Sequence, residues 1–102
     1  MRFAWDTQLT DLLGQPINDE SGSPIMLGTL IVQALMSQDR KDLDGATKFA
    51  RYQLAVKVHD GGDIDVTEAA LIKEVCGNVL TPLPVGRIWE LLENPIAEKA
   101  VK

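Results

Sequence analysis

The sequence has little cysteine, few aromatic side chains and no long apolar run. Its 102 residues include one cysteine, Cys76, so no disulfide forms within the chain and a secreted, disulfide-held scaffold is excluded. The longest mainly apolar stretch, Leu30 to Met36, is far shorter than the ~20 residues that a transmembrane helix needs. An acid, Asp6, stands close to the N-terminus, and no apolar segment of the kind found in signal peptides lies there. No signal peptide is therefore expected. These shortages predict a protein of a reducing, aqueous compartment that works away from membranes.

Basic residues are also scarce. Fifteen acids against ten bases give a formal net charge of −5. Affinity for phosphate comes from Lys and Arg that displace counterions, so this balance opposes nucleic acid binding. The densest basic spot is residues 40–41, and it is flanked by three acids, Asp39, Asp42 and Asp44. We therefore predict no nucleic acid partner, and expect the acidity to serve solubility or contact with another protein.

Residue types that carry catalysis or bind metals are nearly missing. One histidine and one cysteine cannot supply the four ligands of a structural zinc site. His59 precedes the pair Gly61-Gly62, so we expect it to interact with the carbonyl end of a helix. Cys76 lies on an apolar helical stripe, where burial raises a thiol pKa and makes the residue a small hydrophobe. The sequence predicts no catalytic residue, metal or cofactor, and hence no enzyme.

One segment invites comparison with a calcium loop. Aligned with an EF-hand loop, residues 57–68 place Gly62 at the sixth position and Glu68 at the twelfth. The first and third ligand positions are held by Lys57 and His59, where calcium needs oxygen ligands. We favour a joint between two helices, and keep a degenerate EF-hand-like cation-binding domain as an alternative function.

Residues 2–27 indicate β structure. Apolar side chains alternate with other residues from Phe3 to Leu9, which is the pattern of a strand with one buried face. Two short extended pieces then flank a polar turn and predict a hairpin, with Pro16 and Pro24 restricting it to sheet edges. No internal repeat is expected.

The rest of the chain predicts four short helices, at about residues 30–36, 45–58, 65–80 and 84–94. Asp44 is the expected N-cap of the second helix, and Asp65 begins a capping box at the third. The residues expected to form the buried stripes of the last three helices are Phe49, Tyr52, Val56, Ile72, Val75, Cys76, Val79, Val85, Ile88, Trp89 and Leu92. The predicted fold is α+β, with an N-terminal β-hairpin packed on about four helices: a single domain over residues 1–94 and a flexible tail over 95–102.

Two groups of residues are candidates for partner binding. Phe3 and Trp5 share the apolar strand face and are expected in the core, but would form an interaction hot spot if that face is not fully covered. The acids Asp39, Asp42 and Asp44 form a solvated loop that also suits a basic partner.

Two stretches carry a resemblance to known proteins. Residues 9–17, followed by 24–28, resemble the opening of small uncharacterised proteins encoded by tailed phages and prophages, and residues 80–93 resemble their ending. The resemblance covers most of residues 3–93 and contains no chemical motif. It implies a phage context and transfers no catalytic residue.

The first functional hypothesis is a non-enzymatic protein–protein interaction module of a tailed phage or prophage, acting in virion assembly or as an adaptor. Its partner is expected to be phage-encoded, and its location the host cytoplasm or the virion. The alternative is an acidic phage-encoded inhibitor that covers a basic site on a host protein.

Overall fold

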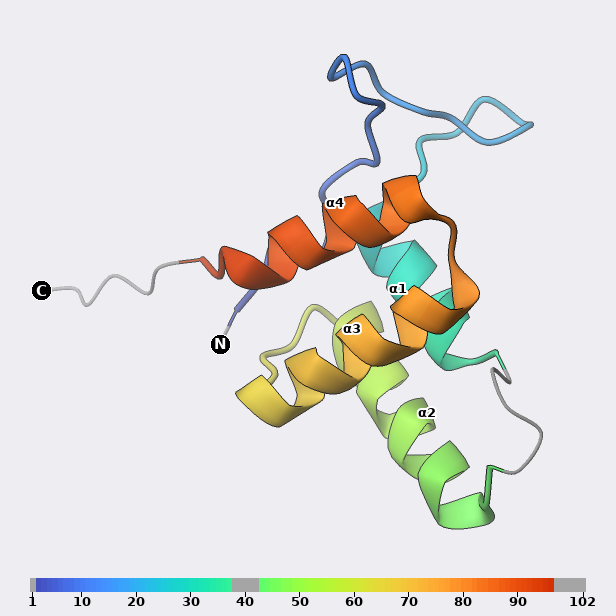
Figure 1. Ribbon diagram of the computed structural model, residues 1–102, viewed down its shortest axis with the longest axis vertical. Coiled ribbons are helices and arrows are strands. Elements are labelled where there is room, and N and C mark those ends of the chain that lie inside the picture. The colour runs from blue at the N-terminus through green and yellow to red at the C-terminus, as the bar shows by residue number, and fades with distance from the viewer. Residues whose placement is uncertain (1, 38–42, 97–102) are drawn as a thin grey trace, which may run out of the picture.

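The computed structural model describes residues 2–37 and 43–96 and is built from four helices (Figure 1). Helix α1 contacts each of the other three, and Figure 1 shows it at the centre of the molecule. The bounds are α1 Leu27–Leu35, α2 Gly45–His59, α3 Val66–Val79 and α4 Pro82–Glu93.

The predicted α+β class is wrong. Among the described residues there is no strand, and the pairing in the N-terminal segment consists of isolated bridges, among them Thr10 with Pro16 and Asn18 with Pro24. A proline has no N–H to donate, so a ladder cannot extend through these positions. The predicted hairpin is therefore replaced by two separately closed turns.

Two helices begin where their capping residues predict. The Asp44 carboxylate accepts a hydrogen bond from the Thr47 N–H at 2.8 Å, which fixes the start of α2. At α3, Asp65 accepts from the Glu68 N–H at 2.7 Å and Glu68 accepts from the Asp65 N–H at 3.0 Å, a complete capping box. These local signals depend on a few neighbouring residues, so the sequence alone identifies them.

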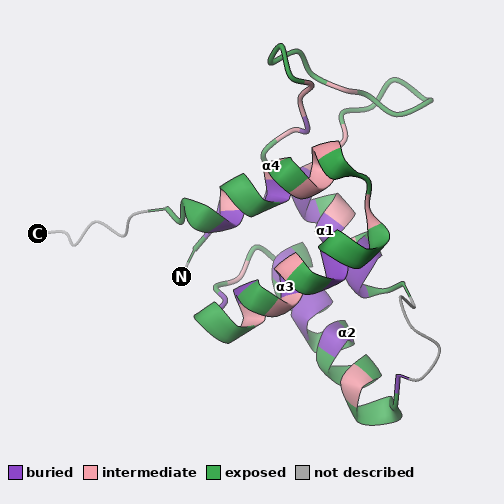
Figure 2. Cartoon of the chain, viewed as in Figure 1, coloured by how far each residue is buried: buried purple, intermediate pink, exposed green. Residues whose placement is uncertain are grey.

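The core lies where α1, α3 and α4 meet, and the buried residues follow these facing surfaces (Figure 2). Its most fully buried side chains are Ile31, Ile72, Val75, Cys76 and Ile88. Burial confirms the predicted stripe of α3 at Ile72, Val75 and Cys76, but its fourth expected member, Val79, is exposed.

The predicted buried face of α2 is wrong. Phe49 and Tyr52 are 58% and 51% exposed, and Val56 is also exposed. The buried residues of α2 are Arg51, Leu54, Ala55 and Val58. Trp89 of α4 was likewise expected in the core and is 44% exposed. Both helices carry large apolar residues on more than one side, so spacing alone does not identify the side that faces the core.

Residues 9–25 contain a tandem repeat, so the expectation of no internal repeat is wrong. The chain reads Asp-x-x-Gly-x-Pro-Ile twice, eight residues apart, at residues 11–17 and 19–25. We call residues 11–16 the first turn and residues 19–24 the second turn. In each, the aspartate accepts hydrogen bonds from the N–H groups two and four residues later. The glycines, Gly14 and Gly22, have φ of 84° and 88°, which favours glycine at both turns.

The bases of the two turns are joined by a closed ring of three backbone hydrogen bonds. Ile17 donates to the Leu9 carbonyl at 3.0 Å, Ile25 donates to the Ile17 carbonyl at 3.3 Å, and Leu9 donates to the Ile25 carbonyl at 2.7 Å. Each of the three residues thus donates once and accepts once. Leu9 is buried, and both isoleucines pack against the core. The ring holds the two turns together, and its three side chains anchor them on the core, although the segment forms no sheet.

The N-terminal segment is tied to the rest of the protein at two further points. The Trp5 indole donates to the Gly62 carbonyl at 3.1 Å, which joins the segment to the connection between α2 and α3. Ile96 donates to the Arg2 carbonyl at 2.8 Å. Ile96 belongs to the predicted tail, whose residues 97–102 lie outside the described part of the chain.

Candidate interaction site

The most exposed large apolar side chains among the described residues belong to the first turn. Leu12 and Leu13 are 87% and 84% exposed. The second turn makes the same hydrogen bonds with Glu20 and Ser21 at the corresponding positions. The turn conformation therefore does not require leucine, and exposing two leucines to water costs solvation free energy. This comparison within one molecule makes the two leucines the candidate contact residues of the described surface.

The first turn is held against α4 by one arginine. The Arg87 guanidinium donates to the carbonyls of Thr10, at 3.2 Å, and of Asp11. It also pairs with Glu90 at 3.2 Å, one turn further along α4. Because a guanidinium presents several donors in a fixed plane, these contacts set the orientation of the turn. The leucine pair is thus presented in a defined position.

An apolar groove runs between the first turn and α4. We call it the turn–helix groove; its lining residues are Asp11, Leu12, Leu13, Pro82, Leu83, Gly86, Arg87 and Glu90. A second hollow continues from it past Pro82 and Gly86 and reaches Gly77 and the half-exposed Trp89. A methyl group added at Gly77 or Gly86 would meet no atom within 4 Å. Glycine weakens a helix interior by roughly 0.5–1 kcal/mol relative to alanine, so both helices give up stability here while internal packing does not demand it.

Three of the predicted partner-binding residues, Phe3, Trp5 and Asp44, do not line this groove. Phe3 and Trp5 are only 5% and 7% exposed and their rings pack together at 5.2 Å. Asp44 is engaged as the cap of α2, and its hydrogen bonds with Thr47 lower the pKa of its carboxyl. Asp39 and Asp42 lie outside the described residues. A partner role for these five residues stays a prediction.

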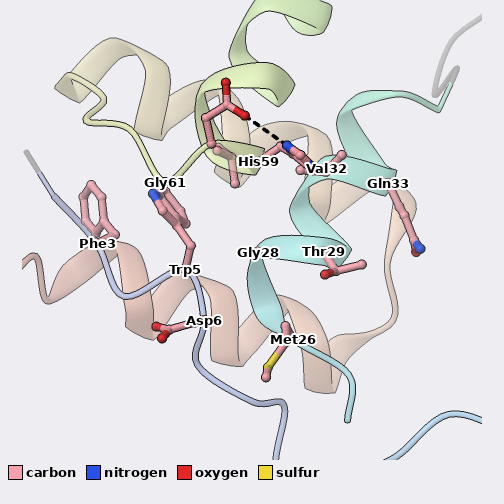
Figure 3. A pocket seen from close by; sticks show the side chains of 12 residues that line it. Phe3, Trp5, Asp6, Met26, Gly28, Thr29, Val32, Gln33, His59 and Gly61 are labelled. Atoms are coloured by element: carbon pink, nitrogen blue, oxygen red, sulfur yellow. Dashed lines mark hydrogen bonds and ion pairs between the residues drawn. The ribbon is translucent and has the colours of Figure 1, made fainter. Parts of the chain in front are cut away.

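Phe3 and Trp5 also line a separate hollow, shown in Figure 3. His59 and Asp60 stand at its edge, with His59 Nδ1 3.1 Å from an Asp60 carboxylate oxygen. A histidine–carboxylate pair is part of many hydrolytic sites, but both side chains here are largely exposed to water. Water weakens the electrostatic attraction in such an exposed pair, so the carboxylate does not fix the orientation of the imidazole.

Cys76 and the loop over residues 57–68 match their predicted environments. Burial raises the pKa of the Cys76 thiol to about 12. In the loop, the Lys57 ammonium occupies the place of the first ligand and pairs with Glu68 at 2.6 Å, which raises the pKa of Lys57. Glu68 also accepts from the Asp65 N–H. Both of its carboxylate oxygens thus have partners within the protein.

The described residues contain no group of three or more His, Cys, Asp or Glu side chains placed to hold a metal ion. Within the same ranges, no helix is both long and apolar enough to span a membrane.

Comparisons of the chain with protein families, with curated proteins and with solved structures found no match.

Proposed function

We propose that the protein is a non-enzymatic protein–protein interaction module that docks its partner through the turn–helix groove. One observation carries the proposal: Leu12 and Leu13 are exposed on a turn whose twin adopts the same hydrogen bonds with Glu20 and Ser21. Exposed apolar side chains beside a groove are typical of the central contacts of protein interfaces.

The groove has the features that such a contact needs. It is lined mainly by apolar side chains, and Arg87 and Glu90 supply charge at its border. Gly86 leaves room for an incoming side chain. A partner that buries both leucines would gain roughly 1.5–3 kcal/mol for each.

The resemblance to small phage and prophage proteins supplies the proposed context, which is virion assembly or an adaptor role with a phage-encoded partner. The proposed location is accordingly the host cytoplasm or the virion. The order of neighbouring genes gives a first check, because capsid or tail genes on both sides favour assembly.

The deciding experiment uses the two turns as a matched pair. A photoreactive amino acid is placed at position 12 of the first turn or at position 20 of the second, in cells that express the chain with its neighbouring genes. We expect light to cross-link position 12, and not position 20, to one defined phage-encoded protein. Equal cross-linking from both positions, or none from position 12, would contradict the proposal.

The same experiment addresses the alternative, an acidic inhibitor of a host protein. A host protein captured at position 12 would favour it, provided that binding weakens steeply as salt rises. Exposed charges are screened beyond about 8–10 Å at physiological ionic strength, so a complex held by an acidic surface must be salt-sensitive.

A further inference from the structure

The charged residues that line the turn–helix groove give it an acidic border. They are Asp11, Arg87 and Glu90, two acids and one base. One oxygen of the Asp11 carboxylate accepts hydrogen bonds from the Leu13 and Gln15 N–H groups, at 2.8 and 2.9 Å. In the described part of the chain its other oxygen has no partner, and no Lys, Arg or His pairs with Asp11. This oxygen is therefore open to a cation from outside.

Arg87 directs its positive charge into the protein. Each of its three guanidinium nitrogens donates to a group of this chain, namely the carbonyls of Thr10 and Asp11 and the Glu90 carboxylate. The Arg87 side chain is only 26% exposed, whereas that of Glu90 is 67% exposed. An acidic segment entering the groove would therefore meet two carboxylates and an arginine that is already engaged. A basic segment would meet the carboxylates first.

The surrounding N-terminal segment supplies no base to offset this border. Residues 3–36 contain four acids and no Lys, Arg or His, and the two turns lie together at one end of the molecule (Figure 1). Interfaces match opposite charges, and like charges repel. Two exposed leucines on a turn would also suit a lipid surface, but cytoplasmic membrane surfaces are anionic and repel acids. The charge thus favours a basic protein segment over an acidic protein, a nucleic acid or an anionic membrane.

Gly86 joins the turn–helix groove to the second hollow. The hollow beside Leu12 and Leu13 and the hollow beside Trp89 share Pro82 and Gly86 in their linings. Gly86 is exposed and has no side chain to separate the two hollows, and a methyl group added there would meet no atom within 4 Å. The backbone of a partner can therefore cross α4 closely at Gly86, with one apolar side chain on each side.

We propose that the turn–helix groove binds a basic amphipathic segment of the partner. Two apolar side chains of this segment lie on the two sides of Gly86, and flanking Lys or Arg residues pair with Asp11 and Glu90. Lys and Arg suit these places because their apolar stems pack on the leucines while the charged ends stay at the border. The inference rests on the proposed docking function and specifies the chemistry of what docks.

Selection from a library of random short peptides tests the proposal on the whole purified chain. Only peptides that lose binding when Leu12→Ser and Leu13→Ser are combined are scored. We expect them to share two large apolar residues flanked by Lys or Arg. Leucine-dependent peptides that are neutral or acidic would overturn this inference and leave the docking function standing, whereas the lack of any leucine-dependent peptide would contradict both. Leucine-dependent binding to vesicles of phosphatidylcholine and phosphatidylglycerol would identify a membrane anchor and overturn the proposal.

Matched charge variants measure what the acidic border contributes. Asp11→Asn combined with Glu90→Gln keeps an accepting oxygen at each side chain and removes two negative charges. It should weaken binding of a selected peptide roughly three- to tenfold. Asp19→Asn combined with Glu20→Gln makes the same change in the second turn, none of whose residues lines either hollow, and should alter the affinity by less than about twofold. Equal losses from the two pairs would show that only the overall charge matters, and would overturn the proposal.

Gly86→Gln tests the crossing point. Glutamine forms helix better than glycine, so the variant should unfold at a higher temperature than the natural chain. Its side chain would stand where the peptide backbone crosses α4, so binding of the selected peptide should weaken more than about tenfold. Weaker binding by a more stable protein does not arise from misfolding. A stabilised variant that binds the peptide as tightly as the natural chain would exclude a segment that crosses α4 at Gly86.

Discussion

Gly28 lies where α1 passes the backbone of Trp5. Its N–H donates to the Trp5 carbonyl at 2.9 Å, and an added Cβ would lie 2.7 Å from that oxygen. We predict that Gly28→Ala lowers the free energy of unfolding by about 1–3 kcal/mol, because backbone must shift to relieve the overlap. Chemical denaturation measures the effect.

Gly77 is the matched control for that substitution. It lies inside α3, and an added methyl group meets open space. Gly77→Ala should raise the free energy of unfolding by roughly 0.5–1 kcal/mol, since alanine loses less backbone entropy in a helix. We expect the two substitutions to change the free energy of unfolding in opposite directions. A change in the same direction would contradict the packing described for Gly28.

Cys76 makes stability depend on pH in the alkaline range. Its thiol pKa rises from an ordinary 9.0 to about 12 because burial disfavours the thiolate. Between these values the unfolded chain binds fewer protons than the native protein, so the free energy of unfolding falls as pH rises, by up to ~1.4 kcal/mol per pH unit. Below the unfolded value both states keep the proton and the contribution vanishes.

Denaturation of the natural chain and of Cys76→Ala, compared at about pH 8 and about pH 10.5, isolates this effect from other titrating groups. The difference in stability between the two proteins should shrink at the higher pH. A constant difference would show that the thiol ionises equally well in the folded protein.

At the scale of elements, Arg87 distinguishes the two turns. It donates to two carbonyls at the first turn, whereas the second turn is built from the same internal bonds. We predict that Arg87→Met increases amide hydrogen exchange at Gln15 and leaves Ser23 unchanged, because only the first turn loses its hold on α4. Both amides donate to the aspartate of their own turn, at 2.9 and 3.0 Å, so the two sites form an internal pair. Equal increases at both would show that Arg87 acts on the whole segment.

The sequence was sufficient for features that neighbouring residues decide. The cap at Asp44 and the box of Asp65 with Glu68 follow from side chains that reach the backbone three residues away. The buried face of α2 was predicted wrongly because Leu54 and Val58 face α1 while the aromatic residues do not. Tertiary packing makes that choice, and a single periodic pattern does not contain it.

The N-terminal segment shows a different cause of error. Alternation from Phe3 to Leu9 correctly predicts buried residues, but the same pattern wrongly predicts a strand. The signal that would have corrected it is the spacing of Asp, Gly and Pro, which recurs after eight residues. Of the candidate site, the exposure of Leu12 and Leu13 could not be predicted, because it depends on how Arg87 holds the turn.

At the scale of the whole molecule, Trp5 connects the N-terminal segment to the helices. Its indole hydrogen bond to Gly62 joins residues far apart in the chain, and its ring packs beside that of Phe3. We predict that Trp5→Phe lowers the free energy of unfolding by about 1–3 kcal/mol, through the lost hydrogen bond and the space left behind. Trp89→Phe, at a half-exposed site, should change it by less than about 1 kcal/mol. Similar losses from both substitutions would contradict the different environments of the two indoles.

The ring of Leu9, Ile17 and Ile25 has a practical consequence. Because the ring closes beneath the second turn, the tip at Glu20 and Ser21 can be opened to accept a peptide epitope or a fluorescent label without disturbing the register of the chain on either side. The grafted group would stand apart from Leu12 and Leu13. The second turn is therefore the place to mark this protein when its partners are followed in living cells.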